Sequence, residues 1–106
     1  MSGKQNLQVV NSERSYIYAL TDPDMTEVRY VGQSINPQSR LVYHCRYPGN
    51  TRLWGWINSF RPVRPGMIIL EECDKSEALE RETFWIEVYK ATGANLLNVM
   101  GMSTAH

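Results

Sequence analysis

Residues 15–32 read SYIYALTDPDMTEVRYVG, and this pattern limits the class of fold that the rest of the chain can complete. Residues 15–20 are rich in aromatic and branched side chains, which favour a β-strand. Thr21-Asp22-Pro23-Asp24 is a strong turn signal that ends this strand. Residues 27–31 then alternate polar and apolar side chains, and Gly32 closes them. The pattern predicts a β-hairpin.

Two helices are expected after the hairpin. Asn36 can cap the first of them, and Pro37 has the backbone angle of a first helical position, so a helix to about Arg46 is predicted. The second helix is predicted over Thr51–Phe60, because apolar residues recur there at helical spacing and Pro62 follows.

The remaining sequence predicts one strand and one helix. Residues 67–70, MIIL, form a short apolar run that is consistent with a buried strand. Asp74 lies three residues before Glu77, as at the start of a helix with a capping box. Helical periodicity continues to about Ala91, and Gly93 is the expected stop. The expected order is β-β-α-α-β-α, an α+β fold with a small, mostly antiparallel three-stranded sheet flanked by helices.

Size and composition are typical of one globular domain: 106 residues, 42% hydrophobic and 21% charged. We expect residues 1–14 to be a flexible segment, residues 15–100 to form the domain and residues 101–106 to be a short tail. The sequence has no apolar run of membrane-spanning length and no signal-peptide core, so a cytoplasmic location without a membrane partner is expected. Cys45 and Cys73 are too isolated for a disulfide framework or a zinc site and are interpreted as packing residues.

The net charge of zero hides an uneven distribution. Residues 28–70 contain six arginines and no acidic residue, whereas residues 71–90 contain seven acids and three bases. An arginine-rich segment suits contacts with a phosphate backbone. A basic surface that offsets the acidic helix is the alternative interpretation.

The last predicted helix places one carboxylate among apolar side chains. On a helical wheel Glu82 falls within the apolar stripe, while Glu80 and Glu87 fall on the opposite side. The stripe consists of Ala78, Leu79, Trp85, Ile86 and Tyr89. A buried carboxylate is costly unless it is paired or binds a metal ion. Glu82 therefore either pairs with an arginine at the edge of the core or binds a metal.

The other candidate residues have both a structural and a functional interpretation. Arg40 and His44 share one face of the first helix, which suits phosphate recognition or proton transfer, but also a solvated surface. Tyr18 and Tyr30 in the hairpin are by themselves typical packing residues, and Asn98 is by itself typical of a turn. The sequence contains no glycine-rich phosphate loop, no pair of CxxC motifs and no HExxH motif.

Taken together in order, these residues resemble the GIY-YIG nuclease family, over about residues 15–99. The matching segments are Tyr16-Ile17-Tyr18, Tyr30-Val31-Gly32 followed by Gln33-Ser34, Arg40-Leu41 with His44, Glu82 with Trp85-Ile86, and Leu97-Asn98. Residues 80–86 look especially like the same stretch in phage intron-encoded homing endonucleases.

Two features depart from the family pattern. Tyr16 replaces the leading glycine of the first signature, which is tolerable if that position mainly supplies strand backbone. Family members with known targets usually carry extra domains, so an additional DNA-binding domain or a partner protein outside this chain is expected to select the target.

The resemblance implies metal-dependent hydrolysis of phosphodiester bonds in DNA. Glu82 would hold a single Mg²⁺ or Mn²⁺, with waters and phosphate oxygens completing its shell. Arg40 would clamp the phosphate and neutralise developing charge.

The remaining roles concern the proton of the attacking water. Tyr18, with Tyr30 as the alternative, would help to deprotonate or orient this water. His44 would relay the proton or bind phosphate, and Asn98 would orient one of these groups. Two other functions stay open: a non-catalytic DNA-binding or interaction module that kept the fold, and a structure-specific repair or RNA nuclease.

Overall fold

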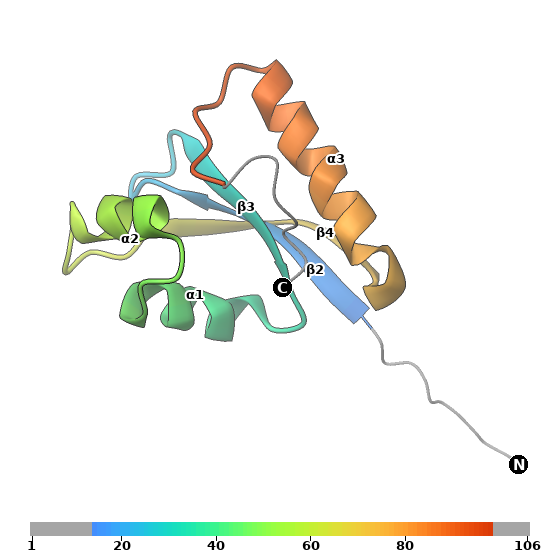
Figure 1. Cartoon of the computed structure of the whole chain (residues 1–106), viewed down its shortest axis with the longest axis horizontal. Coiled ribbons are helices and arrows are strands. Elements are labelled where there is room, and N and C mark those ends of the chain that lie inside the picture. Colours follow the sequence, from blue (N-terminus) through green and yellow to red (C-terminus); the bar gives the residue numbers. More distant parts are fainter. Residues whose placement is uncertain (1–13, 99–106) are drawn as a thin grey trace, which may run out of the picture.

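The computed structural model describes residues 14–98, in which a three-stranded antiparallel sheet lies between a pair of α-helices on one face and a single α-helix on the other (Figure 1). The elements in chain order are β2 (Arg14–Thr21), β3 (Val28–Ser34), α1 (Pro37–Arg46), α2 (Thr51–Asn58), β4 (Gly66–Asp74), the 3₁₀ turn η2 (Lys75–Glu77) and α3 (Ala78–Ala91). The predicted α+β class and element order are confirmed. Apart from Arg14, which begins β2, the expected flexible segment and the expected tail lie outside the described residues.

The central strand of the sheet is β2, with β3 on one side and β4 on the other. Tyr18 is paired with Gly32 of β3 and with Ile69 of β4, and a bulge interrupts the β2–β4 register between Ile17 and Tyr18. Residues 17–21 of β2 are all buried. Their nearly unbroken apolar sequence is therefore explained by helices on both faces of the sheet.

The two faces of the sheet have separate hydrophobic cores. The core on the α1–α2 side contains Tyr18, Leu20, Leu41, Cys45, Leu53, Ile57 and Leu97. The core on the α3 side contains Ile17, Val31, Cys73, Ala78, Ile86 and Leu96. Each core thus holds one buried, free cysteine, as expected of packing residues.

The start of α3 differs from the prediction. β4 continues past the apolar run to Asp74, because Glu71 and Glu72 extend the ladder with Ile17 and Tyr16 of β2. Asp74 makes no side-chain capping bond, so the predicted capping box is wrong.

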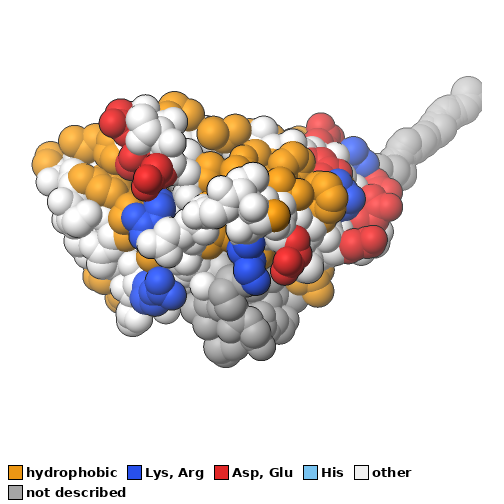
Figure 2. All heavy atoms as spheres, turned by 90° about the horizontal axis from the view of Figure 1, so that it is seen from above, with side chains coloured by type: hydrophobic (Ala, Val, Ile, Leu, Met, Phe, Trp, Pro, Cys, Tyr) orange, Lys and Arg blue, Asp and Glu red, His pale blue; other side chains and the backbone are white. Residues whose placement is uncertain are grey.

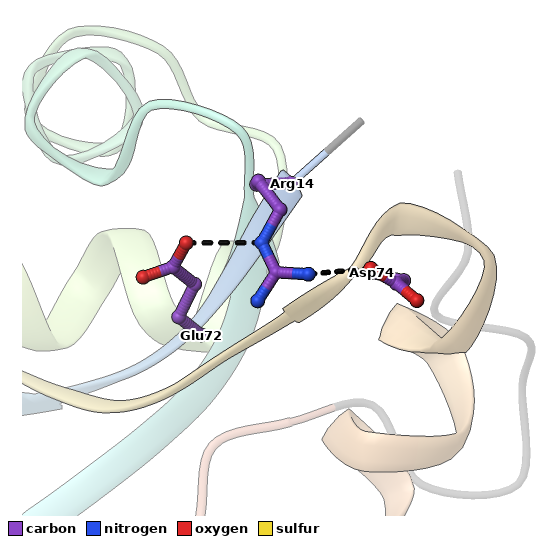
Figure 3. A network of polar contacts seen from close by, with 3 residues as sticks. All are labelled: Arg14, Glu72 and Asp74. Carbon is purple, nitrogen blue, oxygen red and sulfur yellow. Dashed lines mark hydrogen bonds and ion pairs between the residues drawn. The ribbon is translucent and has the colours of Figure 1, made fainter. Parts of the chain in front are cut away.

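The carboxylate of Asp74 accepts a hydrogen bond from Arg14, which also donates from Nε to Glu72 at 3.0 Å (Figure 3). This exposed network joins the beginning of β2 to the end of β4. The 3₁₀ turn η2 follows Asp74 and precedes α3, which begins at Ala78. Leu79 at its first turn is 44% exposed, so its predicted place in the apolar stripe is wrong.

The other helix ends follow the sequence closely. Asn36 caps α1, with its Oδ1 accepting from the Ser39 amide at 3.2 Å. Asn50 caps α2 and also donates to the carbonyl of Leu97 at 2.9 Å, which ties this helix to the segment after α3. α2 ends at Asn58, two residues before the predicted Phe60. Gly93 has a φ of +91°, the left-handed conformation that suits a helix stop. None of the helices in residues 14–98 is long and apolar enough to cross a membrane.

Candidate active site

Three aromatic side chains meet between the sheet and α1. The hydroxyl oxygen of Tyr18 lies 2.9 Å from Nε2 of His44. The ring of Tyr30 lies edge-on to His44, with centroids 5.3 Å apart, and its centroid is 6.3 Å from that of Tyr18. Tyr18 is only 1% exposed, whereas Tyr30 and His44 are partly exposed. β2, β3 and α1 each contribute one member of this cluster.

Burial controls the protonation of all three groups. It raises the pKa of the Tyr18 hydroxyl far above its usual value and raises the pKa of Tyr30 to about 12. Burial, with a smaller effect of the Arg40 charge, lowers the pKa of His44 to about 4. His44 is therefore neutral at pH 7, and a neutral imidazole can accept the Tyr18 proton on Nε2.

Gly32 provides the space for Tyr18. The two residues are paired across the β2–β3 ladder. A Cβ atom at Gly32 would lie 2.6 Å from the hydroxyl oxygen of Tyr18 and 2.7 Å from its Cζ. The glycine is thus required here by the close approach of the phenol and not by an unusual backbone angle.

Glu82 reaches the site from the other side of the sheet. It is 2% exposed, as the helical wheel predicted, and its Oε1 accepts a hydrogen bond from Nε2 of Gln33 at 2.8 Å. Its negative charge raises the pKa of both Tyr18 and Tyr30, so it lies within electrostatic range of the aromatic cluster. Gln33 and Val31 are two residues apart on β3, so both point to the α3 face. The site consequently wraps around β3, an edge strand.

Arg40 supplies the opposite charge. It is exposed on α1, four residues before His44, and its charge lowers the pKa of Tyr18, Tyr30 and His44. Its guanidinium carbon lies 5.5 Å from the ring centroid of Tyr43 on the same helix. This exposed guanidinium, within electrostatic range of Tyr18 and Tyr30, is available to a phosphate group.

Asn98 is placed differently from its expected role. Its Oδ1 accepts from the amide of Val31 at 3.0 Å, and its Nδ2 donates to the carbonyl of Val31 at 2.7 Å. These bonds hold the backbone between Tyr30 and Gly32 and do not involve a side chain of the other candidate site residues. Asn98 is therefore buried beside the site and fixes the strand that carries it.

The single buried carboxylate of Glu82 suits an ion such as Mg²⁺, which needs few protein ligands. Within residues 14–98, no three His, Cys, Asp or Glu side chains form a group that could enclose a metal ion. Mg²⁺ often binds through one or two carboxylates and keeps several waters and substrate phosphate oxygens. Glu82, which accepts a hydrogen bond from Gln33 and lies within electrostatic range of two phenols, matches this open type of site.

The uneven charge of the sequence persists in the fold. α1 and α2 carry no acidic residue, whereas β4 and α3 carry most of the acids. In the view of Figure 2, the larger group of acidic side chains lies at the right-hand end of the molecule, and a smaller group lies at the upper left. A polyanion is therefore favoured on the α1–α2 side.

Sequence patterns identified five of these side chains as a group, and the fold brings them together: Tyr18, Tyr30, Arg40, His44 and Glu82. The sequence did not identify Gln33 as the partner of Glu82. One sequence signal could have identified Gln33: it lies two residues after Val31, and side chains two apart on a strand point to the same face of the sheet.

The comparisons with known proteins agree with this arrangement. The family model described as the GIY-YIG catalytic domain matches residues 14–98, which is most of the chain. No curated protein and no solved structure gives a match.

Proposed function

This chain belongs to the GIY-YIG nuclease family, and from that premise we propose that it is a metal-dependent endonuclease that hydrolyses phosphodiester bonds in DNA. The observation that carries the proposal is the convergence of two phenols, a neutral imidazole, an arginine and a buried carboxylate around β3. These groups can move a proton, bind a phosphate and hold a cation. The cytoplasmic location and a further DNA-binding domain or partner stay predictions.

Proton transfer is assigned to Tyr18 together with His44. A free tyrosinate is strongly disfavoured, because burial raises the pKa of the Tyr18 hydroxyl. No tyrosinate forms if Tyr18 gives its proton to Nε2 of the neutral His44 while it takes one from the attacking water. Burial also disfavours the imidazolium that results, so the negative charge of the bound phosphate is assigned the role of stabilising it. Tyr30, which is more exposed, is then the group that orients the water or the phosphate. The phenol and the imidazole thus act as a relay.

Charge stabilisation is assigned to Arg40 and Glu82. Arg40 binds the scissile phosphate and neutralises charge that develops on its oxygens. Glu82 would hold one Mg²⁺ or Mn²⁺, which would supply Lewis-acid stabilisation of the charge that develops during cleavage. Gln33 keeps the Glu82 carboxylate oriented through its hydrogen bond to Oε1. Asn98 acts only indirectly, by fixing the backbone next to Tyr30.

Plasmid cleavage tests this assignment. Supercoiled DNA is incubated with the parent protein and Mg²⁺ or Mn²⁺, with an EDTA control. Glu82→Ala and Arg40→Ala should abolish nicking, while the matched variant Glu80→Ala, which removes an exposed acid from the same helix, should cleave as the parent does. Circular dichroism of each variant verifies that the fold is kept. Full activity of folded Glu82→Ala or Arg40→Ala would refute the assignment.

If the parent protein does not cleave the plasmid, a second set of substrates is tested. Branched DNA and RNA are then tested under the same conditions, because a structure-specific or RNA nuclease would leave a plasmid intact. If these also stay uncut, the chain is a non-catalytic module with a retained fold.

A further inference from the structure

A row of three side chains continues from the proposed phosphate-binding arginine along the surface of α1. The guanidinium of Arg40 lies 5.5 Å from the ring centroid of Tyr43, and the Tyr43 and Tyr47 ring centroids are 4.9 Å apart. Tyr43 is 49% exposed and Tyr47 is 51% exposed. Arg40, Tyr43 and Tyr47 will be called the α1 row.

The α1 row is not part of the hydrophobic core. α1 is held to the sheet by Leu41 and Cys45, which point to the opposite side of the helix. Tyr47 is the C-cap residue, and its amide donates to the carbonyl of Tyr43 at 2.9 Å, so this hydrogen bond fixes the main chain that carries the two rings. These half-exposed phenols, tilted by 40° to each other, offer apolar ring surface to a ligand.

The surroundings of the α1 row favour an anionic ligand. Residues 28–70, which include all of α1 and α2, contain six arginines and no acidic residue. Arg46 and Arg52 are exposed close in sequence to Tyr47. A surface that combines arginines with exposed aromatic rings suits a nucleic-acid strand, since phosphates pair with the cations and bases stack on the rings.

We propose that the α1 row binds unpaired nucleotides of DNA next to the scissile phosphate, with a base stacked on Tyr47 and Tyr43. This inference rests on the proposed function as a DNA nuclease. It specifies the class of DNA substrate, which has a single-stranded segment beside the cleavage site. Bases within a duplex are already stacked on each other, so they cannot cover an exposed phenol in this way.

The dimensions of the α1 row agree with this occupant. Arg40 and Tyr47 are seven positions apart along α1 and its C-cap, a rise of about 10 Å. Successive nucleotides of a stacked strand are about 3.4 Å apart along its axis. With a phosphate on Arg40, a base about three nucleotides along the strand reaches Tyr47.

Binding of fluorescein-labelled DNA, measured by anisotropy in EDTA, tests the proposal. One probe is a blunt duplex, and the other is the same duplex with a short single-stranded extension. The parent protein should prefer the extended probe. Tyr47→Ala should weaken binding of the extended probe by between about fivefold and a hundredfold, with little change for the blunt probe.

Three further variants separate stacking from folding. Tyr47→Phe keeps the ring and should keep the preference. Tyr47→Leu keeps apolar contact with Tyr43 but lacks a flat ring, so it should lose the preference. Phe84→Ala removes an exposed ring on α3, on the other side of the sheet, and should bind both probes as the parent does.

Equal binding of both probes by the parent protein would overturn the proposal, and so would an unchanged preference in Tyr47→Ala. An equal loss on both probes would also overturn it, because it would show a general effect on the fold or the charge. Because EDTA removes divalent metal ions, the binding assay reports on DNA binding without cleavage. A protein that prefers the extended probe but never cleaves refutes hydrolysis alone, whereas a nuclease without the preference refutes only the role of the α1 row.

Discussion

Replacing Asn98 by alanine should destabilise the protein strongly, although Asn98 lies in a loop after the last helix. Its side chain is 2% exposed and satisfies both the amide and the carbonyl of Val31, a residue with no exposed surface. Alanine leaves both groups without this partner. Each orphaned buried group costs about 1–3 kcal/mol, so we expect a loss of about 2–5 kcal/mol in the free energy of unfolding.

Such a loss is easily measured. Urea unfolding followed by tryptophan fluorescence gives the free energy, and a domain of this size should lose at least about 8 °C in Tm. Asn95→Ala is the matched control, because the side chain of Asn95 is exposed and only its backbone carbonyl binds Arg29. That carbonyl is kept in alanine, so this variant should unfold nearly as the parent does.

The result that would refute the reasoning is a small and equal change in both variants. A loss below about 1 kcal/mol for Asn98→Ala would mean that water or another group replaces its amide without difficulty. Asn98 could then not be described as fixing the backbone beside Tyr30.

Three further predictions concern the site itself. Gly32→Ala should abolish cleavage, because its Cβ would lie 2.6 Å from the Tyr18 hydroxyl oxygen, whereas Gly55→Ala, with nothing near its Cβ, should keep full activity. Equal plasmid nicking by the two variants would contradict this role of Gly32. Gln33→Ala should weaken Mn²⁺ binding by about tenfold or more in a calorimetric titration, since Gln33 orients Glu82, and the exposed Gln38→Ala is its control. Unchanged affinity would disprove this positioning role. The pKa of His44 is lowered from 6.5 to about 4, so the unfolded chain binds a proton that the folded protein excludes, and stability should fall as the pH drops from about 6.5 towards 4. His44 should contribute roughly 2 kcal/mol of this loss by pH 4.5. A similar loss between pH 7 and pH 4.5 in His44→Gln, measured by urea unfolding, would rule this out.

Local sequence signals predicted the fold well where one residue fixes one structural choice. Asn36 caps α1 and Gly93 ends the last helix as expected. The wheel also predicted the burial of Glu82, because a helix places its side chains by a fixed rotation. The same wheel failed for Leu79, which lies in the first turn of α3 where little packs over it.

Contacts between residues that are far apart in the sequence could not be predicted. The capping interpretation of Asp74 failed because Arg14, sixty residues earlier, takes its carboxylate. β4 extends through Glu71 and Glu72 only because β2 lies beside it. Asn98 looked like a turn residue, and the contact of Gln33 with Glu82 requires the packing of α3 on β3. Sequence order selected the members of the candidate site, and tertiary packing determined what each one contacts.

The bonds of Asn98 have a consequence for self-association. β3 is an edge strand, and the outward amide and carbonyl of an edge residue can recruit a strand from another molecule. At Val31 the side-chain amide of Asn98 occupies both groups, and the amide of Leu97 donates to the carbonyl of Arg29 at 2.6 Å. This short segment imitates a fourth strand. It denies strand pairing to a second copy beside Tyr30, the residue proposed to orient the water or the phosphate.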